Sequence, residues 1–594
     1  MIVGCAGAGK TTLLKRLLGC CEEEIKEVKS TEGLEVHEEI FELCEETKSL
    51  EVRYMDQRTK EENATYFNTK TLTFFDFGGQ SAYYACHQIY LTRRAFYVVV
   101  VDASKRLDQV VDQKVCDQVD SVFAGWTYGD YFVFWIKSIH TYCGSDNERE
   151  PMPIVLIVAT HWEDKERMFE TKDDLIKSLK RQLPKSSYLS QYVREDNCYC
   201  TQLCLPLDEV KDCFFYIANQ SRWEENIPKE WFFFGIEINQ KKHSERILKI
   251  WDIKTKVPEI TPKGQKNSNK VEKETKDMLR YYHDAGKALY FPEHDLENKV
   301  IIDVQWFIDA FKHIITDELH FKDIPVSWED WVEFYKTGHL QDKLLTDLWK
   351  HKDEELLECS EKGDKNYDIT DVPYGEDHRY LQYHRKSLLM FMQRLGLLVV
   401  GKEYHYVPCM NRKELEEKLL NLMNNSYSKS SVLIYRFEFL PFFLFFRLVV
   451  ACMQVDGWNV LRSDDTSCLY RNAAFFSYME YNIVLSVTEE SIQIQVFSPM
   501  QGYDLEKVKI YSIQESVEEI LNDFARSFHR KIMFVRGFRC RMDKGKTIAI
   551  DIKEHFLPQK DIPKKDGKMI CPLHPFDHHI INTAELTQYW KVLE

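Results

Sequence analysis

Short apolar runs alternate with helix-like segments through the first third of the chain. Four of these runs are rich in β-branched or aromatic residues and are followed by polar loops: Met1 to Val3, Leu72 to Phe75, Ala95 to Val101 and Ile154 to Ala159. Such runs predict buried strands, and Cys213 to Ala218 is a fifth candidate. Strands that alternate with helices favour a parallel sheet with helices on both faces.

Large apolar residues recur at helical spacing between Asp117 and Cys143. They are Trp126, Tyr131, Phe134, Trp135 and Ile139. An aromatic stripe of this kind usually buries area against a core, so we predict a core-facing helix here and not a ligand site.

Acidic residues are concentrated between Glu22 and Glu62. A charge run of this kind predicts solvated helix and loop surface.

Polar stretches divide the chain. The segment from Lys254 to Lys276 contains few apolar residues and predicts a loop or linker, and a second polar patch covers Asn424 to Ser431. The segment after Lys553 is rich in Pro, Lys and His. We therefore expect four parts, at residues 1–222, 223–423, 424–552 and 553–594.

The composition narrows the class of protein. A chain of 594 residues is too long for one hydrophobic core, and its net charge of -16 argues against nucleic acid as the main partner. Seventeen cysteines, an odd number with no secretory signal before them, indicate reduced thiols and a cytoplasmic protein. The apolar stretch from Leu440 to Met453 includes Arg447 and is shorter than the roughly 20 residues of a membrane-spanning helix, so no transmembrane segment is expected.

The clearest chemical signal is GCAGAGKT, from Gly4 to Thr11, between the first strand and a helix-like segment. It fits the pattern G-x-x-x-x-G-K-[ST] of a phosphate-binding loop, in which main-chain N–H groups and a helix N-terminus surround phosphates. Lys10 would reach the β- and γ-phosphates, and Thr11 would bind Mg²⁺. The predicted nucleotide-binding residues here are Gly4, Ala6, Gly7, Ala8, Gly9, Lys10, Thr11 and Thr12.

A second signal is DFGGQ, Asp76 to Gln80, after the strand TLTFF. Asp76 can hold Mg²⁺, the N–H of Gly79 can bind the γ-phosphate, and Gln80 can orient an attacking water. Gln80 and Lys10 are therefore the candidate catalytic residues.

Base recognition is predicted after the strand IVLIVA, at Thr160, His161 and Glu163. A guanine-binding protein places a carboxylate there that accepts hydrogen bonds from N1 and N2 of the purine. Glu163 is one methylene longer than the usual Asp, and Asp164 is the alternative; an exposed acidic loop is the competing interpretation.

Two further positions leave alternatives open. Thr31 in STEGLEV would close over Mg²⁺ when the γ-phosphate is present, or it lies in an ordinary helix-to-strand turn. Arg93 or Arg94 would enter the catalytic site, or they pair with acidic neighbours, which is the commoner use.

Together these segments resemble a known family. DFGGQSAYYACHQIYLTRRAFYVVVVDAS, with GCAGAGKT, STEGLEV and ATHWE, resembles the Roc (Ras of complex proteins) GTPase domain of Roco proteins. GKALYFPEHDLENKVIIDVQWFIDA, VSWEDWVEFYKTGHLQDKLLTDLW, LLMFMQRLGLLVV, YHYVPCM and FLPFFLFFRLVVACM resemble their COR (C-terminal of Roc) domain. The similarity covers about Met1 to Cys540.

The resemblance implies an arrangement of the whole chain. It implies a Roc-like P-loop GTPase domain over residues 1–222, a mainly helical COR subdomain over 223–423, an α/β COR subdomain over 424–552 and a tail. FWIKSIHTY is nearer to the subgroup of the malignant fibrous histiocytoma-amplified sequence proteins than to the kinases. Leucine-rich repeats and a kinase domain are absent from the sequence, so these activities are not carried over.

The expected function is that of a Mg²⁺-dependent GTPase switch whose nucleotide state controls the COR domain. Intrinsic turnover is expected at about 10⁻⁴ to 10⁻² per second. The resemblance also implies a homodimer through COR, with Phe437 to Phe446 as candidate contacts or plain core, and unidentified signalling proteins as partners. The alternatives are a catalytically weak scaffold that keeps the loop for folding, and an ATP-driven switch, which would leave DFGGQ unexplained.

Two features stand apart from this interpretation. Only Met1 to Val3 precede the phosphate loop, where a first strand of about five or six residues is typical, so the sequence leaves open whether the native chain begins earlier. In the tail, Cys571, His574, His578 and His579 lie close enough in sequence to bind one Zn²⁺. A surface loop is the preferred interpretation there, because the segment offers one thiolate and lacks a familiar ligand spacing.

Overall fold

The structure is a computed structural model, and its chain forms two compact units. The first contains residues 1–118, 125–325 and 345–391, and the second contains 119–124, 326–344 and 392–594. The residues described are 1–26, 28–53, 70–116, 118, 121–144, 153–162, 167–184, 188–202, 206–223, 225–242, 245–250, 253, 268–292, 294–315, 326–350, 381–499, 504–527, 534–540, 555–563, 567–574, 576 and 579–591.

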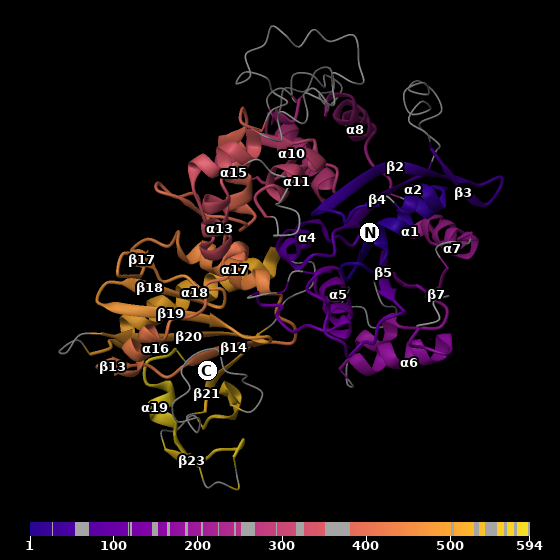
Figure 1. Ribbon diagram of the computed structural model, residues 1–594. Helices are drawn as coiled ribbons and strands as arrows, with labels where there is room; N and C mark the ends of the chain where they lie inside the picture. The colour runs from indigo at the N-terminus through magenta and orange to yellow at the C-terminus, as the bar shows by residue number, and fades with distance from the viewer. Residues whose placement is uncertain are drawn as a thin grey trace. The chain divides into compact units, whose positions relative to one another are not determined.

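A seven-stranded sheet in the order β3-β2-β4-β1-β5-β6-β7 forms the centre of the first unit (Figure 1). Its strands are β1 (Ile2–Gly4), β2 (Leu34–Cys44), β3 (Ser49–Val52), β4 (Thr71–Phe77), β5 (Tyr97–Asp102), β6 (Val155–Thr160) and β7 (Cys198–Cys200). The strands from β4 to β7 in this order are parallel, whereas β2 and β3 pair antiparallel at one edge. The four main predicted strands are confirmed as β1, β4, β5 and β6.

Helices cover both faces of this sheet. Alternate sheet residues such as Val98 and Leu156 pack in one core with α1 (Lys10–Leu17) and α7 (Asp208–Ala218). The other face packs against α5 (Tyr128–Cys143), which is followed along the chain by α6 (Lys172–Gln182). The predicted α/β fold with a mainly parallel sheet is therefore confirmed.

The aromatic stripe is confirmed as core except at Trp126, which precedes the helix and is only partly buried. Thr127 caps the start of α5 through a capping box with Asp130. The buried residues of this helix include Tyr131, Phe134, Trp135 and Ile139.

Two predicted elements are wrong. The fifth strand candidate, Cys213 to Ala218, belongs to helix α7, because Val210, Phe214 and Ile217 recur at helical spacing and are the buried positions. The acidic stretch after Glu22 contains helix α2 (Glu22–Lys26) but continues into strands β2 and β3.

The strand β2 forms because its apolar residues alternate with acidic ones. Phe41 and Leu43 are buried in the core, and Glu42 between them is only partly buried. Period-two alternation of this kind is typical of a strand with one covered face. Because acidic residues dominate the segment, this alternation was not recognised in the sequence.

The rest of the first unit is α+β. Its elements are α8 (Lys229–Lys241), β8 (Ile247–Lys249), α10 (Ser268–Asp284), β9 (Leu289–Tyr290), β10 (Lys299–Ile301) and α11 (Val304–Lys312). The three strands form an antiparallel sheet in the order β8-β10-β9 over a core that includes Phe234, Met278 and Val300. Helix α15 (Arg385–Arg394) begins in the last segment of this unit, and its final residues belong to the second unit.

The predicted linker from Lys254 to Lys276 is wrong in its second half. Residues 254–267 lie outside the described part, but α10 already begins at Ser268. Lys276 pairs with Glu272 one turn earlier at 2.8 Å, and the buried Met278 and Leu279 attach the helix to its core. The polar residues at the end of the predicted linker form the first turns of an amphipathic helix.

The second unit is built on an antiparallel sheet in the order β15-β18-β19-β20-β14-β21-β22, with β13 paired to β20. Its strands are β13 (Ser428–Lys429), β14 (Leu433–Phe437), β15 (Trp458–Val460), β18 (Ala473–Tyr478), β19 (Tyr481–Val487), β20 (Ser491–Ser498), β21 (Phe534–Arg539) and β22 (Phe556–Pro558). Smaller strands are β11 (His339–Leu340), β12 (His405–Tyr406), β16 (Arg462–Ser463) and β17 (Thr466–Ser467). Its helices are α13 (Trp328–Thr337), α16 (Glu417–Asn424), α17 (Phe442–Cys452) and α18 (Lys507–Ser527).

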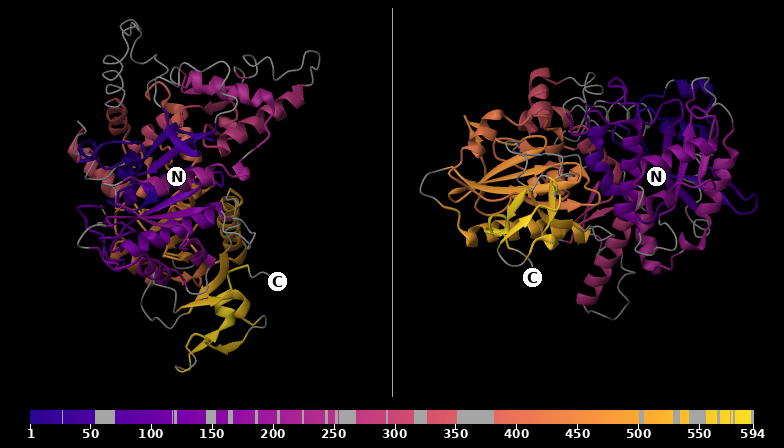
Figure 2. Two further views of the ribbon diagram at one scale, coloured as in Figure 1. Left: turned by 90° about the vertical axis from the view of Figure 1, so that its right-hand side faces the viewer. Right: turned by 90° about the horizontal axis from the view of Figure 1, so that it is seen from below.

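The tail belongs to the second unit. It contains the hairpin β23 (Lys568–Ile570) and β24 (Ile580–Asn582) and helix α19 (Thr583–Thr587), drawn in yellow beside the orange strands in Figure 2. The indole N–H of Trp590 donates to the carbonyl of Ser431 at 3.0 Å, which fixes the end of the chain to the main sheet. No helix in the described residues has both the length and the apolar character needed to cross a membrane.

Candidate functional site

The phosphate-loop sequence forms the turn between β1 and α1. Gly4 has φ of 147°, and a Cβ there would lie 2.4 Å from the carbonyl oxygen of Val100. Gly9 precedes the helix in the left-handed conformation, with φ of 85°. Both positions require glycine, and the turn directs the N-terminus of α1 toward the loop interior.

Lys10 extends into this loop. Its ammonium donates to the carbonyls of Gly4 at 3.1 Å and Cys5 at 2.8 Å, and its side chain is buried. Burial lowers the pKa of Lys10, and the nearby Asp76 carboxylate opposes that shift. The loop therefore encloses one cation beside main-chain dipoles, which suits an anionic group.

Three oxygen-bearing side chains converge beside the loop. The hydroxyl of Thr11 donates to Asp76 Oδ2 at 2.6 Å. The hydroxyl of Thr31 lies 3.0 Å from the same oxygen and also contacts the Thr11 hydroxyl, so its single proton goes to one of these two acceptors. Asp76 is fully buried, and its Oδ1 has no hydrogen-bond partner among the described residues. Burial raises the pKa of Asp76, opposed by the Thr11 hydrogen bond. The sequence left open whether Thr31 lies in this site, and the structure brings it there.

The DFGGQ turn packs directly on the loop. A Cβ at Gly79 would lie 2.4 Å from the nitrogen of Ala6 and 2.6 Å from the ammonium nitrogen of Lys10. The N–H of Gly78 donates to the carbonyl of Gly33 at 2.7 Å. The two segments that follow strand β4 and helix α2 therefore meet at the loop.

Gln80 is buried beside this turn. Its amide nitrogen donates to the carbonyl of Val115 at 2.8 Å. Val115 also faces the loop, because a Cβ at Gly7 would lie 2.9 Å from its side chain. The candidate catalytic amide is thus held by the segment that joins β5 to α5.

His87 links the same two segments. It ends helix α4 (Tyr84–His87), and its Nε2 lies 2.9 Å from the carbonyl oxygen of Gly33. Burial lowers the pKa of His87 to about 3, so the ring is neutral near pH 7 and Nε2–H donates to that carbonyl.

Of the predicted base-recognition residues, Thr160 contacts the phosphate loop. The hydroxyl of Thr160 donates to the carbonyl of Ala8 at 2.9 Å and lies 3.3 Å from that of Val101. His161 follows β6 with a φ of 55° and is exposed. Glu163 and its alternative Asp164 lie outside the described residues, so the guanine contact stays a prediction.

The two arginines have structural contacts. Arg93 donates to the carbonyl of Gly144 at 2.8 Å. Arg94 pairs with Glu225 at 2.9 Å and lies 4.7 Å from the ring centre of Tyr281. These contacts favour the structural alternative for Arg94.

Sequence reasoning missed Val115, Tyr84 and His87. The hydroxyl of Tyr84 donates to the carbonyl of Gly79 at 3.2 Å. Tyr84 and His87 stand in the segment that follows DFGGQ, so their nearness in sequence was an available signal. Val115 acts through its main chain, which no side-chain motif reveals.

Comparison with known proteins places this site in context. Residues 1–124 match the family model described as "Ras of Complex, Roc, domain of DAPkinase". Two similar proteins of Dictyostelium discoideum are the probable serine/threonine-protein kinases pats1 and qkgA, which are 23% identical over 91% of the chain and 20% identical over 66%. The chain spans 14% and 25% of their lengths.

Among solved structures, the chain is similar to the Methanosarcina barkeri protein described as "Roco2 RocCORdC bound to GDP". The identity is 16%, the TM-score is 0.37, and the match covers 69% of this chain and 94% of the other. The Roc match and the Dictyostelium relatives agree with the resemblance to Roco proteins, and the subgroup stays a prediction.

Proposed function

We propose that the N-terminal α/β domain binds guanine nucleotide with Mg²⁺, hydrolyses GTP slowly, and passes its nucleotide state to the α+β region that follows. The observation that carries the proposal is the convergence of Thr11, Thr31 and Asp76 beside a loop that encloses the Lys10 ammonium. These groups come from three separate segments of the sequence. A buried carboxylate held by two hydroxyls next to a cationic loop matches the needs of a polyphosphate and its metal.

The residues present fit a magnesium ion. Hard divalent cations prefer carboxylate and hydroxyl oxygens, and Asp76 Oδ1 is a buried oxygen without a hydrogen-bond partner among the described residues. Thr11, Thr31 and Asp76 would hold the ion. Bound Mg²⁺ would neutralise charge on the β- and γ-phosphates.

The loop itself would hold the phosphates. The Lys10 ammonium would exchange its hydrogen bonds with the carbonyls of Gly4 and Cys5 for phosphate oxygens. Gly79 packs against the loop at Ala6, and its N–H would donate to a terminal phosphate. The similarity of residues 1–124 to a Roc domain supports guanine as the base. A competition between GTP and ATP tests that preference.

The contact that would carry the nucleotide state is between the Thr31 segment and helix α11. Gln305 accepts from the N–H of Val36 at 2.8 Å and donates to the carbonyl of Leu34 at 3.3 Å. A Cβ at Gly33 would lie 3.2 Å from Lys312 Cβ. A rearrangement of the Thr31 segment on hydrolysis would therefore change these contacts with α11. In this way a segment with two conformations can shift the position of a neighbouring element.

Hydrolysis would require Gln80 to exchange its hydrogen bond with Val115 for an attacking water. The need for that exchange supports slow intrinsic turnover. The pairing of Arg94 with Glu225 supports it too, because a paired Arg94 does not act in catalysis. The same observation favours a second candidate, a nucleotide-bound scaffold that does not hydrolyse GTP, because Gln80 is already engaged.

Single-turnover hydrolysis of GTP separates these two candidates. We expect Gln80→Leu to hydrolyse GTP at least tenfold more slowly than wild type while binding GTP equally well. Gln118→Leu is the matched control, because its amide donates to the hydroxyl of Tyr131 at 2.8 Å. Equal rates for wild type and Gln80→Leu would support the scaffold instead.

A homodimer through the COR-like region and unidentified signalling partners complete the proposal. The candidate segment Phe437 to Phe446 contributes Phe437, Phe443 and Phe445 to the buried core, so the contact would need other surfaces of that region. Light scattering in the GDP and GTP states tests the dimer. A monomer at micromolar concentration in both states contradicts it.

A further inference from the structure

Cysteine and histidine side chains from the tail meet a cysteine of the main sheet region in the second unit. Cys540 follows β21, Cys571 follows β23, and His579 precedes β24. His574 lies in the loop between the last two. The sequence favoured a surface loop at His574, His578 and His579. His578 lies outside the described residues, His574 and His579 are partly buried, and Cys540 and Cys571 are fully buried.

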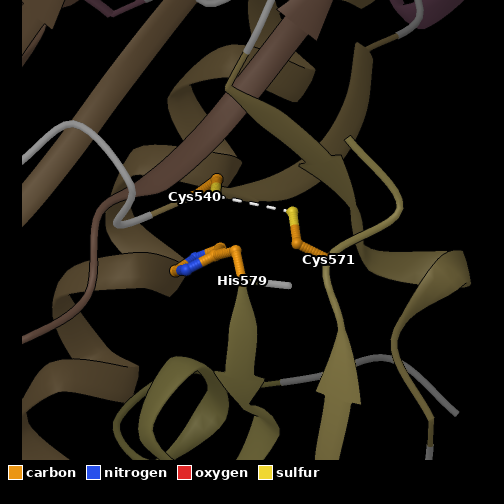
Figure 3. Close-up of side chains that lie close together, drawn as sticks. All are labelled: Cys540, Cys571 and His579. Carbon is orange, nitrogen blue, oxygen red and sulfur yellow. Dashed lines mark hydrogen bonds between the residues drawn. The ribbon is translucent and has the colours of Figure 1, made fainter. Parts of the chain in front are cut away.

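The two sulfurs lie close to each other and to a nitrogen of each histidine. Cys540 Sγ and Cys571 Sγ are 3.5 Å apart, and each lies 3.5 Å from His574 Nδ1. One nitrogen of His579 lies within 4.8 Å of both sulfurs. Figure 3 shows the two thiols facing each other with the His579 ring beside them.

The three separations among Cys540, Cys571 and His574 match the edges of a tetrahedral zinc site. With Zn–S near 2.3 Å and Zn–N near 2.0 Å, the edges of the tetrahedron are about 3.3 to 3.8 Å long. The three measured edges fall in that interval. A disulfide requires its sulfurs at about 2.05 Å, so Cys540 and Cys571 are not bonded to each other here.

A buried ring nitrogen of His579 supports a ligand at this place. Nε2 of His579 and Nδ1 of His555 have no hydrogen-bond partner among the described residues. The His555 ring lies 5.5 Å from that of His574. An unpaired buried nitrogen is costly, and coordination to a metal removes that cost for His579.

The local backbone holds the donors in place. The N–H of Cys571 donates to the carbonyl of His579 at 2.8 Å, and the N–H of His574 donates to that of Cys571 at 3.1 Å. The N–H of Cys540 donates to the carbonyl of His555 at 2.8 Å. The hairpin β23–β24 has strands of three residues each, which is short for independent stability. A metal would fasten this hairpin to the main sheet at Cys540.

We propose that Cys540, Cys571, His574 and His579 bind one structural Zn²⁺. Two thiolates and two imidazoles form a closed set of four ligands, which is typical of a structural zinc and leaves no position for a substrate. Binding releases the thiol protons, and the binding free energy adds to the stability of the tail. The site is separate from the nucleotide-binding loop, so it does not depend on the proposed GTPase function.

The metal content of the 594-residue chain, purified under reducing conditions without added chelator, tests the proposal. We expect about one zinc per chain in wild type, and at most a tenth of that in Cys571→Ala and His579→Ala. Cys452→Ala is the matched control, because Cys452 is also a fully buried thiol of this unit and lies on α17. It should keep its zinc.

Two further measurements separate loss of the ligand from misfolding. His579→Cys replaces one zinc ligand by another and should keep the metal where His579→Ala loses it. Co²⁺ added to the reduced, zinc-depleted wild type should give the intense visible bands of tetrahedral cobalt and a thiolate-to-cobalt charge-transfer band. Folded, reduced wild type that contains no zinc and gives no such bands would overturn the proposal, as would a Cys540–Cys571 disulfide in wild type as purified under reducing conditions.

Discussion

Thr160→Val tests how the strand next to the phosphate loop supports it. The Thr160 side chain is fully buried, and its hydroxyl donates to the carbonyl of Ala8 in the loop at 2.9 Å. Valine keeps the shape of the side chain but leaves that acceptor without its donor. A buried polar group left unsatisfied costs about 1–3 kcal/mol, which we expect in the free energy of unfolding of the first unit.

Part of this cost should appear in nucleotide binding, because the carbonyl belongs to the loop itself. If re-ordering the loop on nucleotide binding costs roughly 1 kcal/mol, the Kd for GTP rises about fivefold. The assay is a fluorescence titration with a labelled GTP analogue, beside urea unfolding of the same samples.

The matched control is Thr583→Val in the second unit. Thr583 is also buried, and its hydroxyl donates to the carbonyl of Gly567 at 2.9 Å. We expect this variant to lose stability without any change in the Kd for GTP. A Thr160→Val protein that binds GTP as tightly as wild type, or a control that weakens binding equally, would refute the reasoning.

Two further variants test the segments that meet at the loop. Gly79→Ala places a methyl group 2.4 Å from the nitrogen of Ala6, so the DFGGQ turn must move away at a cost of about 1–3 kcal/mol. We expect the ratio of GTP to GDP affinity to fall at least fivefold. The control Gly125→Ala has nothing within 4 Å but is strained by its φ of 80°, so it should lower stability and leave that ratio unchanged. The pKa of His87 is lowered to about 3, against about 6.5 when unfolded, so its contribution to stability is complete above pH 6.5 and is lost as the pH falls toward 3. At pH 5 that loss is about 2 kcal/mol, at about 1.4 kcal/mol per pH unit. His87→Gln should lose that much less than wild type between pH 7 and pH 5 in urea unfolding, and equal losses would contradict the pKa shift.

The sequence predicted the sheet and the loop because their signals are local. A buried parallel strand is a short apolar run, and GCAGAGKT needs only a strand before it and a helix after it. The strand β2 was missed because the acidic residues that face away from the core dominate its composition. Helix α7 was mistaken for a strand because its apolar run is short, and periodicity separates the two only over a longer window.

The site was predictable in part for the same reason. Asp76 and Thr11 lie in recognisable motifs. Thr31 was a candidate without a motif, and the fold brings it next to them. The contact of Gln80 with Val115 was not predictable, since it is made by a main-chain carbonyl in a long connection. In the tail, three of the four proposed zinc ligands are close in sequence, but Cys540 stands 31 residues before Cys571 and reaches them only through the sheet.

The most direct test of the central claim is the dependence of GTP affinity on Mg²⁺ in wild type and Asp76→Asn. Asparagine keeps the size of the side chain and removes its charge, and burial raises the pKa of Asp76, so the exchange does not remove a stabilising charge. We predict that wild type binds GTP at least tenfold more weakly in EDTA than with Mg²⁺, and that Asp76→Asn binds with one weak affinity in both conditions. A wild-type protein that binds no GTP, or an Asp76→Asn protein that keeps the full response to Mg²⁺, would contradict the account.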